Sequence, residues 1–333
     1  MKSITIMQKS LLVTLTALTI VSLPGCASTP SSVANEISED NDSGSSVTEI
    51  SKDGNTIGET AITETASTET TVAEETQEQK EAEYTLQEME FFRDDMKICG
   101  RLYLPAGDGP FPVAIMAHGL GQNMGVMDGY AKLFAKDGIA AFTFDFIGGG
   151  HAIRSDGKMT DMSVLTEAAD FNIVFDGIRS LDMIDANNVY VMGDSQGGFV
   201  ATYIACTRPE EVKGLIALYP AYILQDDAKE RTKDGTQFYD TFNLLGMTLS
   251  RQYDEDLLSF DIYEIMKNYN GDVLLIQGTK DQLVPIADSE RAAETFSSAE
   301  LILIEGAGHG FNGNDQTYAA QCAIDFIKNK AAD

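Results

Sequence analysis

The fold is decided by residues 189–200, which read VYVMGDSQGGFV. The first four are apolar or aromatic, as in a short buried strand, and a helical pattern begins at Gln196. Gly193-Asp194-Ser195-Gln196-Gly197 stands between the two and matches GxSxG. In that pattern a sharp strand-to-helix turn exposes a serine hydroxyl, and the glycines let neighbouring backbone pass without a Cβ clash. The stretch therefore predicts a nucleophilic Ser195 at the end of a strand.

Short apolar runs alternate with helical patterns on both sides of this motif. Residues 86–92 and 96–103 predict a hairpin, and further strands are predicted at 113–117, 140–144, 214–218, 273–277 and 301–304. Helices are predicted at 127–136, 161–181, 196–207, 286–296 and 316–328. The alternation predicts an α/β domain over residues 84–333, with a mostly parallel sheet and helices on both faces. Residues 221–270 are too long for an ordinary connection and predict a small inserted cap.

The second helix has an apolar stripe that sets its expected orientation. Its members recur at helical spacing, with Thr160 or Asp161 available as the N-cap, and are Leu165, Ala168, Ala169, Ile173, Val174 and Ile178.

A serine hydroxyl needs a base, and the chain has three histidines. His309 follows the last predicted strand in the loop GAGHG, whereas His118 and His151 precede Ser195. The order nucleophile, acid, histidine accompanies this motif in α/β-hydrolases, and only His309 fits it. Asp281 lies between the two in sequence, just after the strand at 273–277, and is the expected acid. Asp288 is the alternative, but it falls in the next predicted helix.

Two backbone amides are expected to hold the oxyanion, those of Gln196, next to the nucleophile, and Leu120, behind the turn His118-Gly119. The helix N-terminus at Gln196 adds a positive dipole. His118 is expected chiefly to stabilise its turn, with substrate contact as the alternative, and His151 either lines the pocket or is a plain loop residue. Tyr222, Gln237 and Tyr239 of the cap are able to bond a substrate hydroxyl or to serve as core residues.

The chain resembles bacterial feruloyl (cinnamoyl) esterases and related serine hydrolases from about Phe92 to Ile327. The resemblance is carried by residues 117–120 (AHGL), 145–146 (DF), 155–159 (SDGKM), 163–165 (SVL), 194–198 (DSQGG) and 306–309 (GAGH). It implies the α/β-hydrolase fold, the triad Ser195, Asp281 and His309, and a small cap over the acyl pocket. The chain departs from these esterases at Asp194, where they usually carry His, in the glycine-rich residues 148–151, and in the poorly matching cap.

The N-terminus predicts export. Lys2 and Lys9 precede the apolar residues 11–23, which are too short for a comfortable membrane span, so residues 1–25 read as a signal peptide. The run ends in LPGC, which resembles a bacterial lipobox, and Cys26 is therefore the expected lipidation site on a cell-surface lipoprotein. The alternative is ordinary cleavage and release. Residues 26–83 are rich in Ser, Thr and Glu and predict a disordered tether.

The net charge of −29 argues against nucleic acid or an anionic membrane surface as a partner, which leaves the lipid as the expected membrane contact. Cys99, Cys206 and Cys322 lack metal-ligand spacing, and no metal or cofactor is expected. The sequence thus predicts a serine esterase acting on a small or polysaccharide-linked ester. Alternatives on the same fold are a lipase or lysophospholipase, a thioesterase or a serine peptidase, and a different class is an inactive scaffold that serves as a binding lipoprotein.

Overall fold

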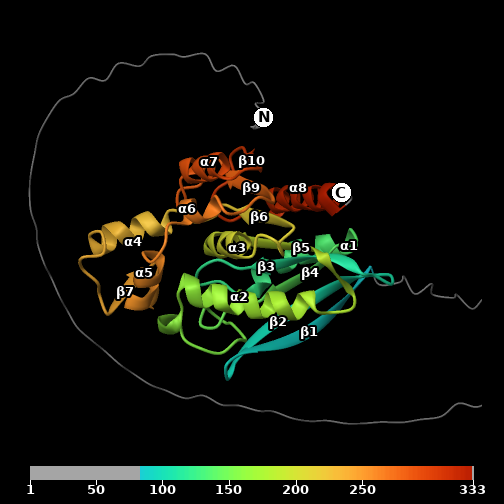
Figure 1. The fold of residues 1–333 in the computed structure, drawn as a ribbon, viewed down its shortest axis with the longest axis horizontal. Coiled ribbons are helices and arrows are strands. Elements are labelled where there is room, and N and C mark those ends of the chain that lie inside the picture. The colour runs from blue at the N-terminus through green and yellow to red at the C-terminus, as the bar shows by residue number, and fades with distance from the viewer. Residues whose placement is uncertain (1–82, 332–333) are drawn as a thin grey trace, which may run out of the picture. The chain divides into compact units, whose positions relative to one another are not determined.

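An eight-stranded sheet runs through residues 83–331, the part of the chain that the computed structural model describes (Figure 1). The predicted signal peptide, Cys26 and almost all of the predicted tether lie outside these residues. The strand order is β1-β2-β4-β3-β5-β6-β9-β10. The first two strands, β1 (Tyr84–Arg93) and β2 (Met96–Pro105), form the predicted antiparallel hairpin, and β2 pairs antiparallel with β4 (Ala140–Phe144).

The remaining strands are parallel to one another, as predicted. They are β3 (Phe111–Ala117), β5 (Ile184–Asp194), β6 (Gly214–Leu218), β9 (Asp272–Gly278) and β10 (Ala299–Ile304). Their buried, apolar sequences suit a sheet covered on both faces. Because the carboxyl ends of parallel strands share one edge, the residues after β5, β9 and β10 are brought together there.

Helices cover both faces of the sheet, and each face has its own apolar core. Side chains alternate along a strand, so in β3 Ile115 joins one core while Ala114 and Met116 join the other. The first core includes residues of α2 (Val164–Arg179), α3 (Gln196–Thr207) and α7 (Ile286–Thr295). The second includes residues of α1 (Asp128–Lys136) and α8 (Gly313–Ala331). The predicted two-sided α/β architecture is confirmed.

The start of α2 was placed wrongly from the sequence. Met159–Asp161 form a separate 3₁₀ turn, and the helix is capped by Ser163, whose side chain accepts from the Thr166 amide in a capping box. The buried face also differs, because Phe171 and Phe175 lie in the core whereas Ile173 is 37% exposed. Ala168, Val174 and Ile178 of the predicted stripe are buried, and the rest of the buried face is made by Phe171 and Phe175, which were not assigned to it.

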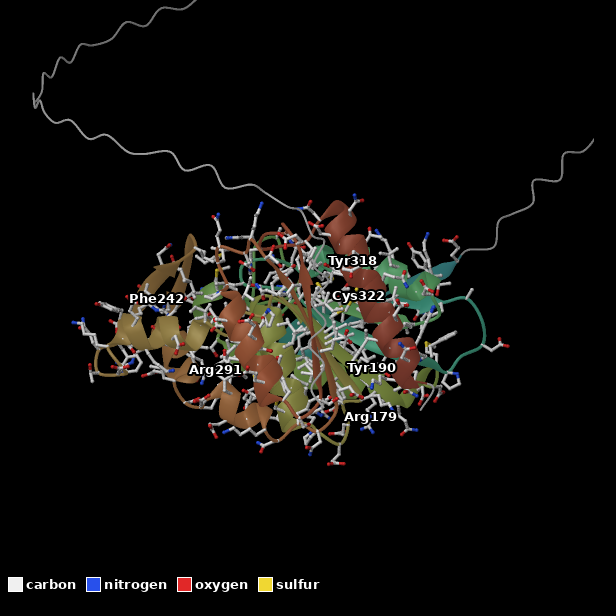
Figure 2. The ribbon with its side chains drawn as sticks, turned by 90° about the horizontal axis from the view of Figure 1, so that it is seen from above. Arg179, Tyr190, Phe242, Arg291, Tyr318 and Cys322 are labelled. Carbon is white, nitrogen blue, oxygen red and sulfur yellow. The ribbon has the colours of Figure 1, made fainter. Side chains whose placement is uncertain are left out.

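Residues 221–270, the range expected to form a cap, lie between the neighbouring strands β6 and β9 and are called the insertion. It contains α4 (Leu224–Thr232), the hairpin of β7 (Thr241–Leu244) and β8 (Met247–Ser250), α5 (Arg251–Leu257) and α6 (Ile262–Met266). Figure 1 shows α4, α5 and β7 grouped beyond one end of the sheet. The Arg231 guanidinium lies 4.4 Å from the Phe242 ring, labelled in Figure 2, and pairs with the buried Asp254. Among the helices of residues 83–331, none combines the length and apolarity needed to cross a membrane.

Candidate active site

Ser195 stands at the junction of β5 and α3 in a backbone conformation that non-glycine residues rarely adopt, with φ 51° and ψ −119°. Its amide donates to the Leu218 carbonyl at 3.0 Å, and its carbonyl accepts from the Phe199 and Ala221 amides. A Cβ on Gly197 would lie 2.5 Å from the Ala117 carbonyl oxygen, so only glycine fits there. The surrounding backbone therefore enforces the turn that lifts the Ser195 hydroxyl from the sheet.

His309 joins the serine to a carboxylate. It follows β10, and its Nε2 lies 3.0 Å from Ser195 Oγ, while its Nδ1 lies 2.9 Å from Asp281 Oδ2. A carboxylate oxygen only accepts, so Nδ1 carries a proton and Nε2 is left to accept the serine proton. The Asp281 side chain is fully buried and the His309 side chain is 17% exposed. The three residues proposed from the sequence thus lie in one hydrogen-bonded chain at the predicted sheet edge.

Asp281 is held by four hydrogen bonds. Its Oδ1 accepts from the Leu283 and Val284 amides, each at 2.9 Å, and its Oδ2 accepts from Gln277 Nε2 at 2.9 Å as well as from His309. Gln277, at the end of β9, is fixed in turn because its Oε1 accepts from Ser289 Oγ. Gln277 was missed from the sequence, although a buried amide that ends an apolar strand just before the acid was a usable signal.

The amides of Leu120 and Gln196 flank the nucleophile. Gln196 is the first residue of α3, and Leu120 follows Gly119, at which a Cβ would lie 3.1 Å from Ser195 Cβ. Within residues 83–331 neither amide donates a hydrogen bond to another group. Both are therefore available to an oxygen atom at Ser195, and their role in holding an oxyanion stays a prediction.

The Gln196 side chain connects this region to the insertion. Its Nε2 donates to Glu167 Oε2 at 2.8 Å, and its Oε1 accepts from Tyr253 OH of α5 at 2.5 Å. Glu167 is fully buried, and desolvation raises the pKa of its carboxyl well above the usual range. A Cβ on Gly121, next to Leu120, would also collide with Met247 of β8. The insertion thus packs against both segments that supply the free amides.

For His118 and Tyr222 the structure favours the structural alternative over substrate contact. His118 is 0% exposed, with Nδ1 bonded to the Gly119 carbonyl and Nε2 accepting from the Phe146 amide, and burial lowers its pKa. Tyr222 is 1% exposed, and its hydroxyl bonds Thr202 Oγ1 at 2.8 Å. Neither residue offers surface to a ligand. Both stabilise the core, because their polar atoms are paired inside it.

The other three proposed contacts lie at the surface. His151 is exposed, and its amide donates to the Gly121 carbonyl, which places it near the Leu120 turn. Gln237 and Tyr239 precede β7, and Gln237 Nε2 donates to Tyr239 OH at 3.0 Å. Their contact with a substrate remains a prediction. Within the described residues 83–331, no three His, Cys, Asp or Glu side chains gather in a way that could hold a metal ion.

Comparison with known proteins agrees with this geometry. The family model described as "Serine aminopeptidase, S33" matches residues 109–259, and the model described as "TAP-like protein" matches residues 261–331. A solved structure of Est1E from Butyrivibrio proteoclasticus with ferulic acid superposes with a TM-score of 0.68 at 22% identity. It covers 74% of this chain and 100% of that one. The chain therefore has the α/β-hydrolase fold.

Two curated relatives of this chain show how far the likeness extends. The quorum-quenching protein AidA of Acinetobacter baumannii is 30% identical over 112 residues, which are 33% of this chain and 36% of AidA. Monoglyceride lipase of Mus musculus is 26% identical over 214 residues, 61% of this chain and 67% of the lipase. The chain therefore spans about a third of the length of AidA and about two thirds of the lipase.

Proposed function

We propose that this α/β-hydrolase is a serine esterase that cleaves carboxylic esters through an acyl-enzyme. The observation that carries the proposal is the continuous chain from Ser195 Oγ through His309 to Asp281, with hydrogen bonds of 3.0 and 2.9 Å. These distances suit proton transfer without rearrangement. The names of the curated relatives, which include a lipase and an esterase, agree with an ester bond as the target.

The geometry supports the following sequence of steps. Ser195 Oγ attacks the ester carbonyl carbon while its proton passes to His309 Nε2, and the carbonyl oxygen becomes an oxyanion held by the Leu120 and Gln196 amides. The carbon–oxygen bond then breaks, and the alcohol leaves with the proton from His309. Water attacks the acyl-enzyme, giving its proton to His309, and the carboxylic acid departs as Ser195 regains a proton. Asp281 holds the tautomer and stabilises the imidazolium throughout.

The acyl group is a finer part of the proposal. Est1E was solved with ferulic acid, and that likeness in fold supports feruloyl or other acyl esters of plant polysaccharide as candidates. Lipid esters, thioesters and short peptides use the same chemistry. Initial rates on feruloyl, acetyl, long-acyl and aminoacyl chromogenic substrates would separate these. A preference of at least tenfold for one class identifies the substrate.

Labelling by a fluorophosphonate probe tests the enzyme itself. We expect wild-type protein to be labelled at Ser195 and the Ser195→Ala variant to remain unlabelled. A folded wild-type protein that neither reacts with the probe nor hydrolyses any ester would refute the esterase and favour an inactive scaffold that binds ligands.

We also propose export and anchoring through a lipid on Cys26, with residues 26–83 as the tether. The support is the apolar run of residues 11–23 followed by LPGC. Expression in a bacterium should place the protein in the detergent phase after Triton X-114 separation, and Cys26→Ser should move it to the aqueous phase. Equal partitioning of both forms into water would refute the anchor.

A further inference from the structure

A cavity of about 240 Å³ lies beside the catalytic groups, and its wall follows them in the sequence. Asp194 precedes Ser195, Phe311 comes two residues after His309, and Gln122 belongs to the turn that carries Leu120. The Tyr219 ring, also in the wall, packs edge-on against the His309 imidazole, with 4.8 Å between the centroids. None of the wall residues comes from the inserted residues 221–270. This cavity therefore adjoins the triad without involving the insertion.

Two buried polar atoms of the wall have no partner among the described residues 83–331. They are Asp194 Oδ1 and the Tyr130 hydroxyl, and each residue is only 2% exposed. The other oxygen of Asp194 accepts a long hydrogen bond, 3.4 Å, from Tyr219 OH, and the nearby Gly119 amide and Gln122 side chain also act to lower the pKa of the carboxyl. Burying a polar group without a hydrogen-bond partner is energetically unfavourable. Two such atoms in the wall of one cavity point to a ligand that satisfies both.

The wall chemistry limits what that ligand is. Asp194 is its charged residue, and no Lys or Arg lines it, so an anion is excluded. A purely apolar group would leave both atoms unpaired. An ammonium group has three N–H donors for these acceptors, and the rings of Tyr130, Tyr219 and Phe311 favour a cation. Burial with no cation nearby raises the pKa of Asp194 to about 7, and a bound cation would restore the carboxylate.

We propose that this cavity binds the primary ammonium group of an organic amine. The amine either belongs to the ester that is cleaved or is a separate small molecule, and the recognition chemistry is the same for both. The first source rests on the proposed esterase function, whereas binding to the cavity does not.

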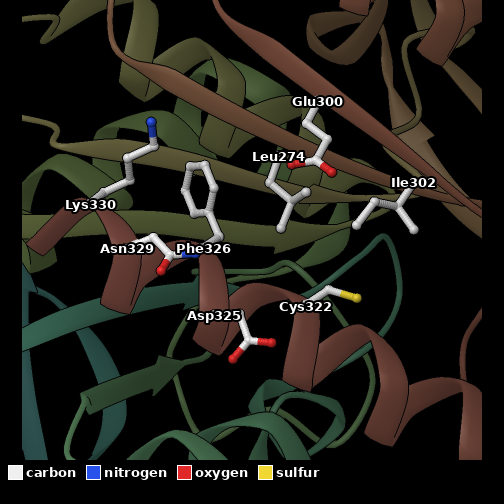
Figure 3. A pocket seen from close by; sticks show the side chains of 8 residues that line it. All are labelled: Leu274, Glu300, Ile302, Cys322, Asp325, Phe326, Asn329 and Lys330. Carbon is white, nitrogen blue, oxygen red and sulfur yellow. The ribbon is translucent and has the colours of Figure 1, made fainter. Parts of the chain in front are cut away.

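A second cavity serves as a comparison, because its wall lacks the unpartnered polar atoms of the first. It has a volume of about 300 Å³ and lies between α8 and the strands β9 and β10 (Figure 3). Within residues 83–331 none of its lining residues has an unpartnered buried polar atom, and its Lys330 pairs with Asp272 at 2.9 Å. Nothing in its wall calls for a ligand.

Calorimetric titration of the full 333-residue chain tests binding without relying on activity. n-Propylammonium chloride is compared with 1-propanol at one ionic strength, set with NaCl. We expect saturable binding of the ammonium at least tenfold tighter than that of the alcohol. Asp194→Asn should weaken it by about tenfold to a hundredfold, because a hydrogen bond to a charged group is lost. Tyr130→Phe should weaken it by roughly threefold to tenfold for the loss of one neutral bond.

Tyr190→Phe is the matched control, since it also removes a buried phenol hydroxyl. Tyr190 lies beside α8 (Figure 2), and its OH donates to the Ile327 carbonyl at 3.4 Å, so the affinity should not change. Circular dichroism and a thermal melt establish that each variant is folded. Propanol binding as tightly as propylammonium, the absence of ammonium binding, or unchanged affinity in both folded cavity variants would overturn the proposal and leave a water-filled cavity.

Paired esters separate the two sources. Ethyl 6-aminohexanoate is compared with ethyl heptanoate, and 5-aminopentyl acetate with hexyl acetate, so that each pair exchanges only NH₃⁺ for CH₃. A preference in kcat/KM of at least tenfold for one amino ester, lost in Asp194→Asn, assigns the ammonium to the substrate. Binding of propylammonium without such a preference assigns it to a separate amine. If fluorophosphonate labelling fails while propylammonium still binds, the esterase proposal is refuted and the proposed amine site is retained.

Discussion

Replacing Asp281 by asparagine should abolish most activity through the histidine tautomer. The two backbone amides of Leu283 and Val284 both donate to Oδ1, so the asparagine oxygen is held on that side. Its NH₂ group then faces Gln277 Nε2 and His309 Nδ1, which are both donors in the wild type. His309 can relieve this clash by moving its proton to Nε2. In that tautomer it cannot accept the proton of Ser195.

The expected loss in kcat is about 10⁴-fold, with KM changed little, because the substrate-binding surfaces are untouched. Two charge-assisted hydrogen bonds are also lost, which should destabilise the fold by a few kcal/mol at about 1.5–3 kcal/mol each. Steady-state hydrolysis of a chromogenic ester measures the first effect, and urea unfolding measures the second.

Asp288→Asn is the control, since it makes the same chemical change in α7. Within residues 83–331 the Asp288 side chain has no bond to His309, and kcat should stay within about threefold of wild type. The reasoning would be refuted if folded Asp281→Asn kept more than a tenth of wild-type kcat, or if Asp288→Asn lost as much.

Three further predictions follow from buried contacts. Tyr253→Phe leaves the Gln196 side-chain oxygen without its donor and should lower kcat about tenfold at constant KM. The control Tyr190→Phe should lose a similar melting temperature and keep the wild-type kcat. Equal kcat values for the two variants would exclude a positioning role for Tyr253. Gly197→Ala should destabilise the fold by at least about 1–3 kcal/mol in urea. Gly308→Ala should cost less than about 0.5 kcal/mol, because its Cβ would meet only the Lys280 carbonyl oxygen, at 3.9 Å. The pKa of Asp194, about 7 when folded against 3.8 unfolded, makes the native state bind the extra proton, so stability should fall as pH rises from about 4 to about 7. Asp194→Asn should flatten that decline in unfolding free energy, and an identical pH profile for the two proteins would contradict it.

The strand–turn–helix at residues 189–200 was predictable because its requirements are local. The apolar run makes a buried strand, and the glycines at 193 and 197 permit the turn that every neighbour then enforces. The order of Ser195, Asp281 and His309 was enough to bring them to one edge, since each follows a parallel strand whose carboxyl end lies there. Chain order and the geometry of a parallel sheet were therefore sufficient to predict that the three side chains lie close together.

The α2 boundary was not predictable in the same way. Thr160 and Asp161 are the N-caps expected from the sequence, whereas the observed N-cap, Ser163, bonds both Thr166 and Asp256 of α5. The second partner is 93 residues away in sequence and belongs to the insertion. A contact distant in sequence therefore contributes to the start of this helix, and local propensity does not report such a contact.

Polar residues on the apolar faces of helices and strands indicate which side chains position the catalytic groups, and sequence motifs do not include them. Glu167 lies three residues after Val164 and four before Phe171, so helical spacing alone puts its carboxyl on the core side of α2. A buried carboxyl needs a partner, and Gln196 and Tyr253 supply that connection between the insertion and the segment beside the nucleophile. Gln277, at the end of β9, is likewise a buried polar residue, and it holds Asp281 in place by donating to Oδ2. In this chain a buried Glu or Gln near a catalytic motif identifies the residues that hold the reacting groups in place. The hydrogen bonds that it makes to those residues offset the free energy lost on burying its polar side chain.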